Sequence, residues 1–576
     1  MSAPHLPILE FFATDDAVAV LEASLVAAKG PERLPAMIAL AWQMRQRDTQ
    51  RALALADEAQ TSLADEAASR RCQARLMLIR GEAKFLAGEL DACAALGAKA
   101  LLDFDACRDA IGCADAHWLQ FSIAVGQGDT ARADAELRAV AAAAQSADPV
   151  RVTMAHAALA ARDAHHDVAA ARQKWSAELA AGIVDPHPAA ASWAHGFFAT
   201  LASQSSEHVE SIRHHGTSYT QALATGQIRR AVIAATNLGV EFNNLNDHHA
   251  ALEWMQRGLD LARPHAWPGT MGVALLQTAG TLRELQRFDA ARELLQEAMV
   301  LMAPQAASRN YAVALRYLGE VELKRYQYAD ALANCQLLEQ RAEALKTADL
   351  LCNALRGQAQ ALLELGQPQA ALAKAQAALA AAQSHGVHQI DALRVLADIH
   401  ARHALHPPPG MAAASVTLHY LQQALAVAAT IENYTVPGDL LEAVAQAHAD
   451  AGDTAKAFVL AKQAIAAREI THSQEASNRA VAIRVTHETQ RARAEELHQR
   501  QLAEALAGRA DLLEQANEAY HAVLENAQDA IVLTDSRSHL FAVDRRNGLE
   551  LWSNTQLENR TVTAPVILGD YVVVGD

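Results

Sequence analysis

Small apolar residues recur along most of this chain at the spacing of one face of an α-helix. From residue 251 the sequence ALEWMQRG places a small, a large and a small residue at i, i+4 and i+7. The same pattern starts again at residues 291, 331 and 371, so the repeat is 40 residues long. A pair of helices fits in one repeat but cannot bury its apolar face alone. The pattern therefore predicts a stack of helical hairpins.

The 40-residue spacing extends in both directions. Counting backwards, it reaches Ser211 and Ala171 and then, with slips of one or two residues, Ala133, Cys93 and Ala52. Counting forwards, the segment at 404–410 inserts about six residues, after which the spacing reaches Thr417 and Ala457. We expect about eleven hairpins over residues 30–470, preceded by a helical cap at 1–29.

Short polar segments such as AGEL, GQGD, LNDH and LGQP precede the second helix of most hairpins. Glycine supplies a positive φ at the end of a helix, and Asp or Thr caps the helix that follows. These turns agree with the hairpin pattern. Successive hairpins are expected to stack into a superhelix with a concave inner wall.

The hairpins resemble the tetratricopeptide (TPR) repeat. Leu238, Gly239, Phe242, Ala251, Met255 and Gly258 fall on the key positions of that family, although 40 residues exceeds its usual length of about 34. The resemblance implies an all-α fold, a TPR-like α-solenoid. The residues expected to pack helix on helix are Gly239, Ala251, Ala291, Gly319, Ala331, Ala371 and Ala457.

The same resemblance suggests that the concave groove binds a protein or peptide. Asn237, Asn243 and Asn244 lie on the first helix of one hairpin. Their amides could bond a peptide backbone in the groove. Capping of the helix turn is the alternative role for the three asparagines.

Residues 471–527 predict one long connector helix. Leu502, Leu506 and Leu513 belong to a 4-3 alternation that continues to residue 523, which is the period of a coiled-coil seam. A parallel homodimer through 478–527 is one interpretation, and a single solvated helix is the other. The segment resembles connectors that follow TPR arrays in bacterial signalling proteins and lead to GGDEF output domains. Residues 528–535 resemble the opening of a PAS sensor domain.

The last residues, 536–576, follow a strand pattern. Asn547 and Gly548 separate two alternating segments, and a second hairpin is expected around Gly569 and Asp570. Ala542, Asp544, Gly548, Trp552, Pro565 and Gly575 resemble one blade of a PQQ-type β-propeller. A propeller needs several blades. We expect this tail to be a graft joined near Asp535 or Ser536 to a truncated signalling protein, and a native mini-domain that completes the PAS sheet is the alternative.

Composition and charge exclude several classes of function. The formal net charge is −17, so the concentrated basic surface that binds nucleic acid is not expected. The N-terminus lacks a basic stretch before its apolar residues, and no apolar run approaches the roughly 20 residues that span a bilayer. The six cysteines are scattered and fit a reducing compartment. These features predict a cytoplasmic protein without a membrane span.

No catalytic, metal or cofactor site is expected. The GGDEF signature, the P-loop, the dinucleotide glycine fingerprint and the nucleophile elbow are all missing from the sequence. The paired histidines at 165–166, 214–215 and 248–249, and those at 400, 403 and 406, have no matching ligands at zinc spacing. They are expected to be solvated residues near turns.

These features favour a binding protein, not an enzyme. The first hypothesis is a sensor or scaffold that binds a protein or peptide in the TPR groove and relays the event through a coiled coil to an output domain. The alternative is an outer-membrane assembly component with the TPR part as a docking arm.

Overall fold

This computed structural model describes residues 9–63, 67–181, 187–382, 385–408, 411, 415–431 and 434–471 of the helical part. Beyond these it describes residues 473, 477, 480–481, 505, 508–509, 512–515, 530–534, 540–544, 549–554, 566–568 and 571–573. The chain divides into two compact units, Met1–Val485 and Thr486–Asp576, and each is considered by itself.

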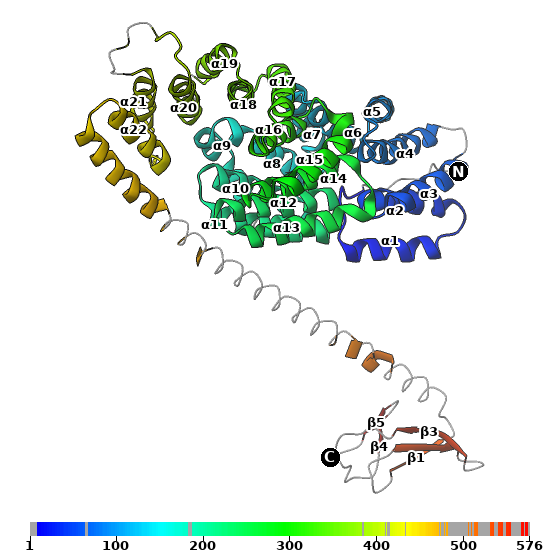
Figure 1. Cartoon of the computed structure of the whole chain (residues 1–576). Coiled ribbons are helices and arrows are strands. Elements are labelled where there is room, and N and C mark those ends of the chain that lie inside the picture. Colours follow the sequence, from blue (N-terminus) through cyan, green and yellow to red (C-terminus); the bar gives the residue numbers. More distant parts are fainter. Residues whose placement is uncertain are drawn as a thin grey trace. The chain divides into compact units, whose positions relative to one another are not determined.

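The first unit is all-α (Figure 1). Its helices are α1 (Asp15–Ala27), α2 (Arg33–Arg47), α3 (Thr49–Thr61), α4 (Ala67–Leu86), α5 (Leu90–Ala106), α6 (Ala110–Gln127), α7 (Thr130–Ala144), α8 (Pro149–His166), α9 (Val168–Ala181), α10 (Pro188–Gln204), α11 (His208–Ala224), α12 (Ile228–Asn244), α13 (His248–Ala262), α14 (Pro268–Glu284), α15 (Phe288–Met302), α16 (Arg309–Lys324), α17 (Tyr328–Leu345), α18 (Ala348–Glu364), α19 (Pro368–Ala381), α20 (Gly386–Arg402), α21 (Val416–Ala428) and α22 (Gly438–Asp450). Short 3-10 turns occupy Gly30–Glu32, Arg263–His265 and Ala303–Gln305.

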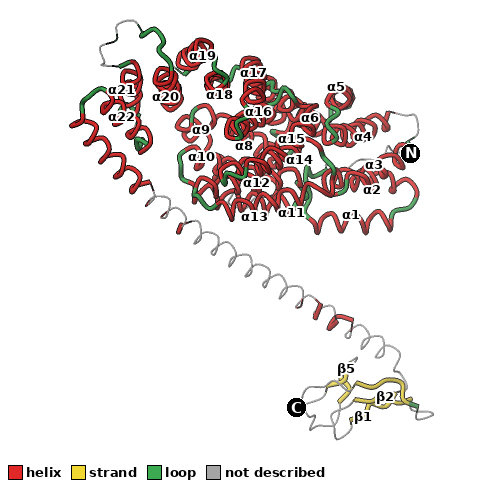
Figure 2. The backbone as a smooth tube through the Cα atoms, viewed as in Figure 1, coloured by secondary structure: helices red, strands yellow, loops and turns green. Residues whose placement is uncertain are grey.

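Consecutive helices pair as hairpins from α2–α3 to α20–α21, and α22 pairs with the helical residues 454–471 (Figure 2). Within the described residues this makes eleven hairpins, which confirms the predicted TPR-like α-solenoid. Helices α12 to α19 follow one another with the 40-residue period intact, because each hairpin has two helices of similar length.

The turns inside the hairpins share one backbone conformation. Ser206, Asn246, Gln286, Tyr326 and Gly366 all have a positive φ, and each follows its predecessor by 40 residues. The next residue closes the helix end with a backbone hydrogen bond to the carbonyl five residues earlier, as from Asp247 to Phe242 at 2.9 Å. Serine, asparagine, glutamine and tyrosine occupy four of these five turns, and glycine, which adopts a positive φ most readily, occupies the fifth.

The repeated small residues lie between the two helices of each hairpin. Ala251, Ala291, Ala331 and Ala371 are each 0% exposed. A Cβ on Gly239 would lie 3.0 Å from the carbonyl oxygen of Ala251, and one on Gly319 would lie 2.8 Å from the Cys335 sulfur. These positions are small because the partner backbone or side chain fills the space.

Ala457 differs from the other predicted packing positions. It is only half-buried, near the start of the helical residues 454–471, and the residues of this helix that pack on Leu441 are Ala464 and Ala467. The packing role of Ala457 therefore stays a prediction.

Hairpins one superhelical turn apart are in contact. Helix α12 touches α2, and α14 touches α4. The Arg229 backbone N–H donates a 3.2 Å hydrogen bond to the Gln46 side-chain carbonyl, 183 residues away, and a Cβ on Gly88 would lie 3.4 Å from the Pro304 ring. About five hairpins thus complete one turn, and the second turn rests on the first.

The second unit carries five short strands: β1 (Ala530–Thr534), β2 (Leu540–Asp544), β3 (Glu550–Asn554), β4 (Val566–Leu568) and β5 (Tyr571–Val573). The first three form an antiparallel sheet in chain order, and β4 pairs with β5. Both predicted β-hairpins are present. Strand β1 from the PAS-like segment pairs with β2 from the blade-like segment, so strands on both sides of the expected junction share one sheet.

Most of the predicted connector helix, including all of its coiled-coil seam except Leu513 and the break at Arg509, lies outside the described residues, as do both predicted hairpin turns of the tail. Among the residues that the structure does describe, no helix combines the length and apolarity that a bilayer crossing requires.

Candidate functional site

The chain's own N-terminal segment lies against the inner helices of the first turn. Residues Leu9–Ala13, here called the strap, are not helical, so the expected cap at 1–29 is helical only over α1 within its described part. Four of the five strap residues are buried. Their backbone groups cannot bond one another as in a helix, so other partners must satisfy them.

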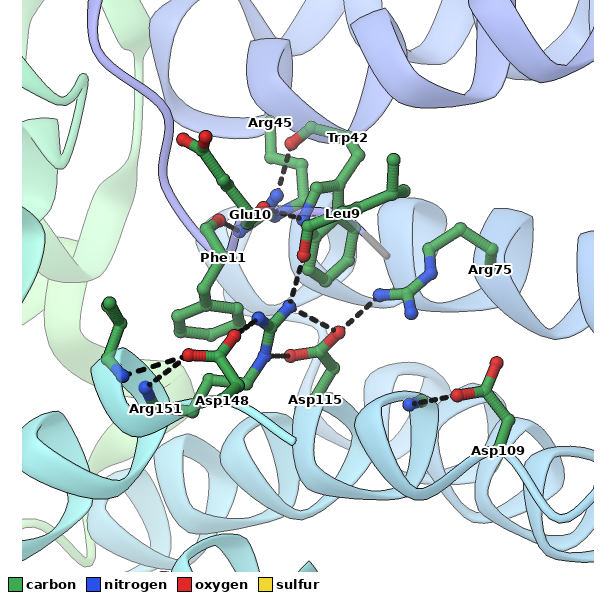
Figure 3. Close-up of polar contacts among 12 residues, drawn as sticks. Leu9, Glu10, Phe11, Trp42, Arg45, Arg75, Asp109, Asp115, Asp148 and Arg151 are labelled. Carbon is green, nitrogen blue, oxygen red and sulfur yellow. Dashed lines mark hydrogen bonds and ion pairs between the residues drawn. The ribbon is translucent and has the colours of Figure 1, made fainter. Parts of the chain in front are cut away.

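Side chains of α2 and α8 provide those partners (Figure 3). Trp42 Nε1 and Gln43 Nε2 both donate to the Glu10 carbonyl, at 3.0 and 2.8 Å. Arg45 Nη2 donates to the Phe11 carbonyl at 3.1 Å, and the Ala13 N–H donates to Gln43 Oε1 at 2.9 Å. The inner wall thus binds this non-helical segment partly through its backbone groups.

Aromatic and cationic groups surround the Phe11 ring of the strap. The ring centroids of Trp118 and Trp42 lie 5.3 and 5.9 Å from it. The guanidinium groups of Arg151 and Arg45 lie over it at 5.0 and 5.5 Å. A cation over an aromatic face is attracted by the ring quadrupole, so the pocket combines apolar burial with directional contacts.

A buried charge network holds Arg151 in place (Figure 3). Asp115 accepts from Arg151 Nε at 2.7 Å and also pairs with Arg75, while Asp148 pairs with Arg151 from the N-cap of α8. Burial alone would raise the pKa of Asp115, but Arg151 and Arg75 outweigh it and hold the pKa below its ordinary value. Burial likewise opposes the charge on Arg151, but Asp115 and Asp148 raise its pKa.

Three hollows share residues of α12, and the first of them also borders the strap. Arg229, Ile233 and Asn237 lie four residues apart on one stripe of that helix. Ile233 lines all three hollows, Arg229 lines the first and second, and Asn237 lines the second and third. We call these hollows together the central groove. Its walls come from α2, α4, α6, α8, α10, α11, α12, α14 and α16, and from Phe11 and Phe12 of the strap.

Only one of the three asparagines predicted to face the groove does so. Asn237 is half-buried in the groove wall. Asn243 instead donates a 2.7 Å hydrogen bond to the Thr281 hydroxyl of α14 and contacts His248 at 3.0 Å. Asn244 is exposed at the end of α12. Neither Asn243 nor Asn244 lines the groove. Asn243 is six residues after Asn237 and so points to another side of α12, whereas Asn244 shares the face of Asn237 but lies at the exposed end of the helix.

The sequence reading missed Arg229 and Arg230. Counting back from Asn237 in steps of four reaches Ile233 and Arg229, so the helical period could have identified Arg229. The aromatic residues that border these arginines come from other hairpins, as Phe85 does from α4 and Trp193 from α10. No sequence spacing indicates that neighbourhood.

Several histidines differ from the expected solvated turn positions. His214 and His215 lie within α11, and His215 is buried, which lowers its pKa to about 4. His195 and His214 approach each other at 2.8 Å between their Nδ1 atoms, and burial followed by the charge on His214 lowers the pKa of His195 to about 4. No group of three or more metal-ligating side chains gathers among the described residues.

No family model matches this chain. A stretch of 53 residues is 55% identical to the outer membrane protein assembly factor BamB of Shewanella oneidensis. The match covers 9% of this chain and spans 13% of the length of that curated protein.

Solved structures similar to this chain have low identity and modest superposition. The apo form of RapI is 10% identical with a TM-score of 0.45, over 63% of this chain and 99% of that one. The apo form of the quorum sensor NprR from B. thuringiensis is 12% identical to this chain with a TM-score of 0.42. The match covers 61% of this chain and 97% of that one. A Rap protein complexed with Competence and Sporulation Factor is 11% identical to this chain with a TM-score of 0.41. The match covers 70% of this chain and 99% of that one.

Proposed function

We propose that the helical array binds a protein or peptide segment in its central groove. The supporting observation is the strap. Side chains of the inner helices bond the backbone of Leu9–Ala13 and enclose Phe11, so this wall already holds one non-helical segment. The adjoining central groove also combines polar and apolar side chains. The Asn237 amide could form hydrogen bonds with a peptide backbone, and Ile233 could contact an apolar side chain of the peptide.

The finer proposal is that this array is the sensor region of a bacterial signalling protein. Binding would bias two arrangements of the connector, with residues 478–527 as a homodimer, and pass the change to an output domain. A cytoplasmic location fits the six cysteines, which are all free. The relay rests on the resemblance of the connector to those of TPR–PAS/GGDEF regulators.

A groove substitution tests the binding proposal. Peptides selected from a random display library on the full chain are measured against wild type, Ile233→Asp and Val300→Asp. Val300 is 74% exposed on α15, so Val300→Asp adds the same charge outside the groove. We expect Ile233→Asp to weaken binding at least tenfold while Val300→Asp leaves it unchanged.

Circular dichroism and thermal melting establish that both variants keep the helical fold. If no peptide binds wild type, or if folded Ile233→Asp binds as well as wild type, the groove is not the binding site.

The BamB similarity supports a second candidate function, an envelope assembly component that docks partners through the helical array. The observation that favours this second function is the 55% identity to BamB over 53 residues. Fractionation of cells that express the chain separates the two candidates. Recovery with the cell envelope would favour the second, and recovery in the cytosol would exclude it.

A further inference from the structure

Two neighbouring arginines at the start of α12 lack a carboxylate partner. Arg229 and Arg230 both line the first hollow of the central groove, beside Phe12 of the strap. Within the described part of the chain, neither forms an ion pair, although 38 pairs involve other groups. Arg230 Nη2 donates only to the Ser192 carbonyl, at 3.2 Å, and its Nε has no hydrogen-bond partner. A buried guanidinium N–H without a partner is unusual and costly.

The two acidic residues that line the first hollow, Glu82 and Asp115, are already engaged by other arginines. Glu82 interacts electrostatically with Arg229, but its carboxylate pairs with Arg45 and accepts from Gln46 Nε2 at 2.7 Å. The strap network differs, because Arg75 and Arg151 there share Asp115. The first hollow therefore carries uncompensated positive charge in a chain whose formal net charge is −17.

The surroundings of the two arginines make this charge unfavourable without an anion. Burial lowers the pKa of Arg229, and burial together with the charge of Arg229 lowers the pKa of Arg230 to about 10. An anion in the hollow beside the two guanidinium groups would oppose both effects.

Aromatic rings flank the same position. The Arg229 guanidinium lies 4.9 Å from the Phe85 ring centroid, and the Arg230 guanidinium lies 4.2 Å from that of Trp193. Trp118 and Phe121 complete the apolar part of the hollow. A ligand group that fits here has a negative end and an apolar body.

We propose that Arg229 and Arg230 form a subsite for a carboxylate that adjoins an apolar or aromatic side chain in a bound peptide. This inference rests on the proposed peptide-binding function and names the chemistry that the groove selects. The carboxylate is either an acidic side chain or the C-terminus of the peptide.

The first experiment uses two pools of random octapeptides with amidated ends, one with Glu fixed at position 5 and the other with Gln. A third pool has Gln at position 5 and a free C-terminus. We expect the Glu pool or the free-acid pool to bind wild type at least tenfold more tightly than the amidated Gln pool. Whichever acidic pool does so identifies the source of the carboxylate. Arg229→Gln and Arg230→Gln should each remove this preference, because a charge-assisted hydrogen bond is lost.

Arg213→Gln is the matched control. Arg213 lies on α11 with 65% of its side chain exposed and pairs with Glu210, outside the central groove. The Arg213→Gln variant should bind the acidic peptide pool in preference to the amidated Gln pool as strongly as wild type does. Equal binding of all three pools would overturn the carboxylate subsite and leave the peptide-binding function standing.

A small probe decides the subsite even if no peptide binds. N-acetyl-phenylalanine carries a carboxylate next to an aromatic ring, and N-acetyl-phenylalaninamide is its neutral counterpart. Thermal-shift titration at constant ionic strength should show stabilisation of wild type by the acid alone, and Arg229→Gln should lose it. Equal shifts with the acid and the amide, or no shift with either, would overturn the proposal.

Discussion

Arg151 Nη2 on α8 donates a 2.9 Å hydrogen bond to the carbonyl oxygen of Leu9, 142 residues earlier in the chain. The same guanidinium pairs with Asp115 on α6 and Asp148 at the start of α8. One side chain thus connects the strap to two hairpins. Arg151 holds the Leu9 end of the strap, and the α2 side chains hold Glu10, Phe11 and Ala13.

Asp115→Asn should destabilise the array strongly. The substitution leaves Arg75 and Arg151 buried without their shared carboxylate, and breaking a buried ion pair costs about 3–5 kcal/mol. Urea unfolding followed by circular dichroism measures the change. Asp57→Asn is the control, since Asp57 is 72% exposed in its pair with Arg80 and should change stability by less than about 1 kcal/mol. Equal effects of the two substitutions would contradict the structural role of the network.

Gly239→Ala should destabilise the protein by about 1–2 kcal/mol, because the new methyl group would overpack the interface with Ala251. Gly216→Ala is the matched control. Gly216 lies within α11, and a Cβ there would meet nothing within 4 Å, so alanine should stabilise by up to about 1 kcal/mol through its helix propensity. Thermal melting of both variants gives the comparison. A stabilising effect at both positions would mean that Gly239 is not packed as described.

Acid should weaken the array in part through His215. Its folded pKa is lowered to about 4 mainly by burial; the charge on Glu241 opposes this shift, and the charges on Arg230 and His214 add to it. The unfolded ring takes up a proton near its ordinary pKa of about 6.5, so stability is complete above that pH and falls as the pH drops toward 4. Between pH 6.5 and pH 5 the loss from this group is up to about 2 kcal/mol.

His215→Gln removes the proton uptake and should flatten this part of the stability curve. Urea midpoints of wild type and variant at pH 7, 6 and 5 measure the difference. Parallel curves for the two proteins would show that His215 does not titrate during unfolding in this range.

Thiol labelling should divide the cysteines by burial. Burial raises the pKa of Cys93 and of Cys335 to about 12, so almost no thiolate is present at pH 8. Cys107 is half-buried at the end of α5 and should react with iodoacetamide first. Peptide mapping by mass spectrometry follows each site. Modification of Cys93 or Cys335 as fast as that of Cys107 in the folded protein would contradict the packing of these hairpins.

Much of the helical array was predictable because it depends on local pattern. The 40-residue recurrence of Ala251, Ala291, Ala331 and Ala371 identified the second helix of each hairpin, and all four are fully buried. The prediction was less accurate at the N-terminal end, where the strap replaces the first part of the expected cap. At an end, a helix has a neighbour on one side only, so repetition no longer determines its contacts.

The groove was predicted only in part. Asn237 could be chosen from the sequence because it lies on the first helix of a repeat that matches the TPR pattern. Asn243 was chosen by the same reasoning, but its amide bonds to Thr281 of the next hairpin. Residues six positions apart do not share a helix face. Knowing where a helix begins and ends, but not which side of it faces the groove, therefore does not separate groove residues from packing residues.

By itself, the sequence determined the hairpins, their number and their period, because helix formation and pairing depend on residues at most about 40 positions apart. Only the tertiary structure decided that the second superhelical turn rests on the first, bringing Gln46 to Arg229 and Phe12 beside both α12 arginines. The curvature accumulates from small rotations at every interface, and no single repeat carries it. The candidate site arises where those distant segments meet.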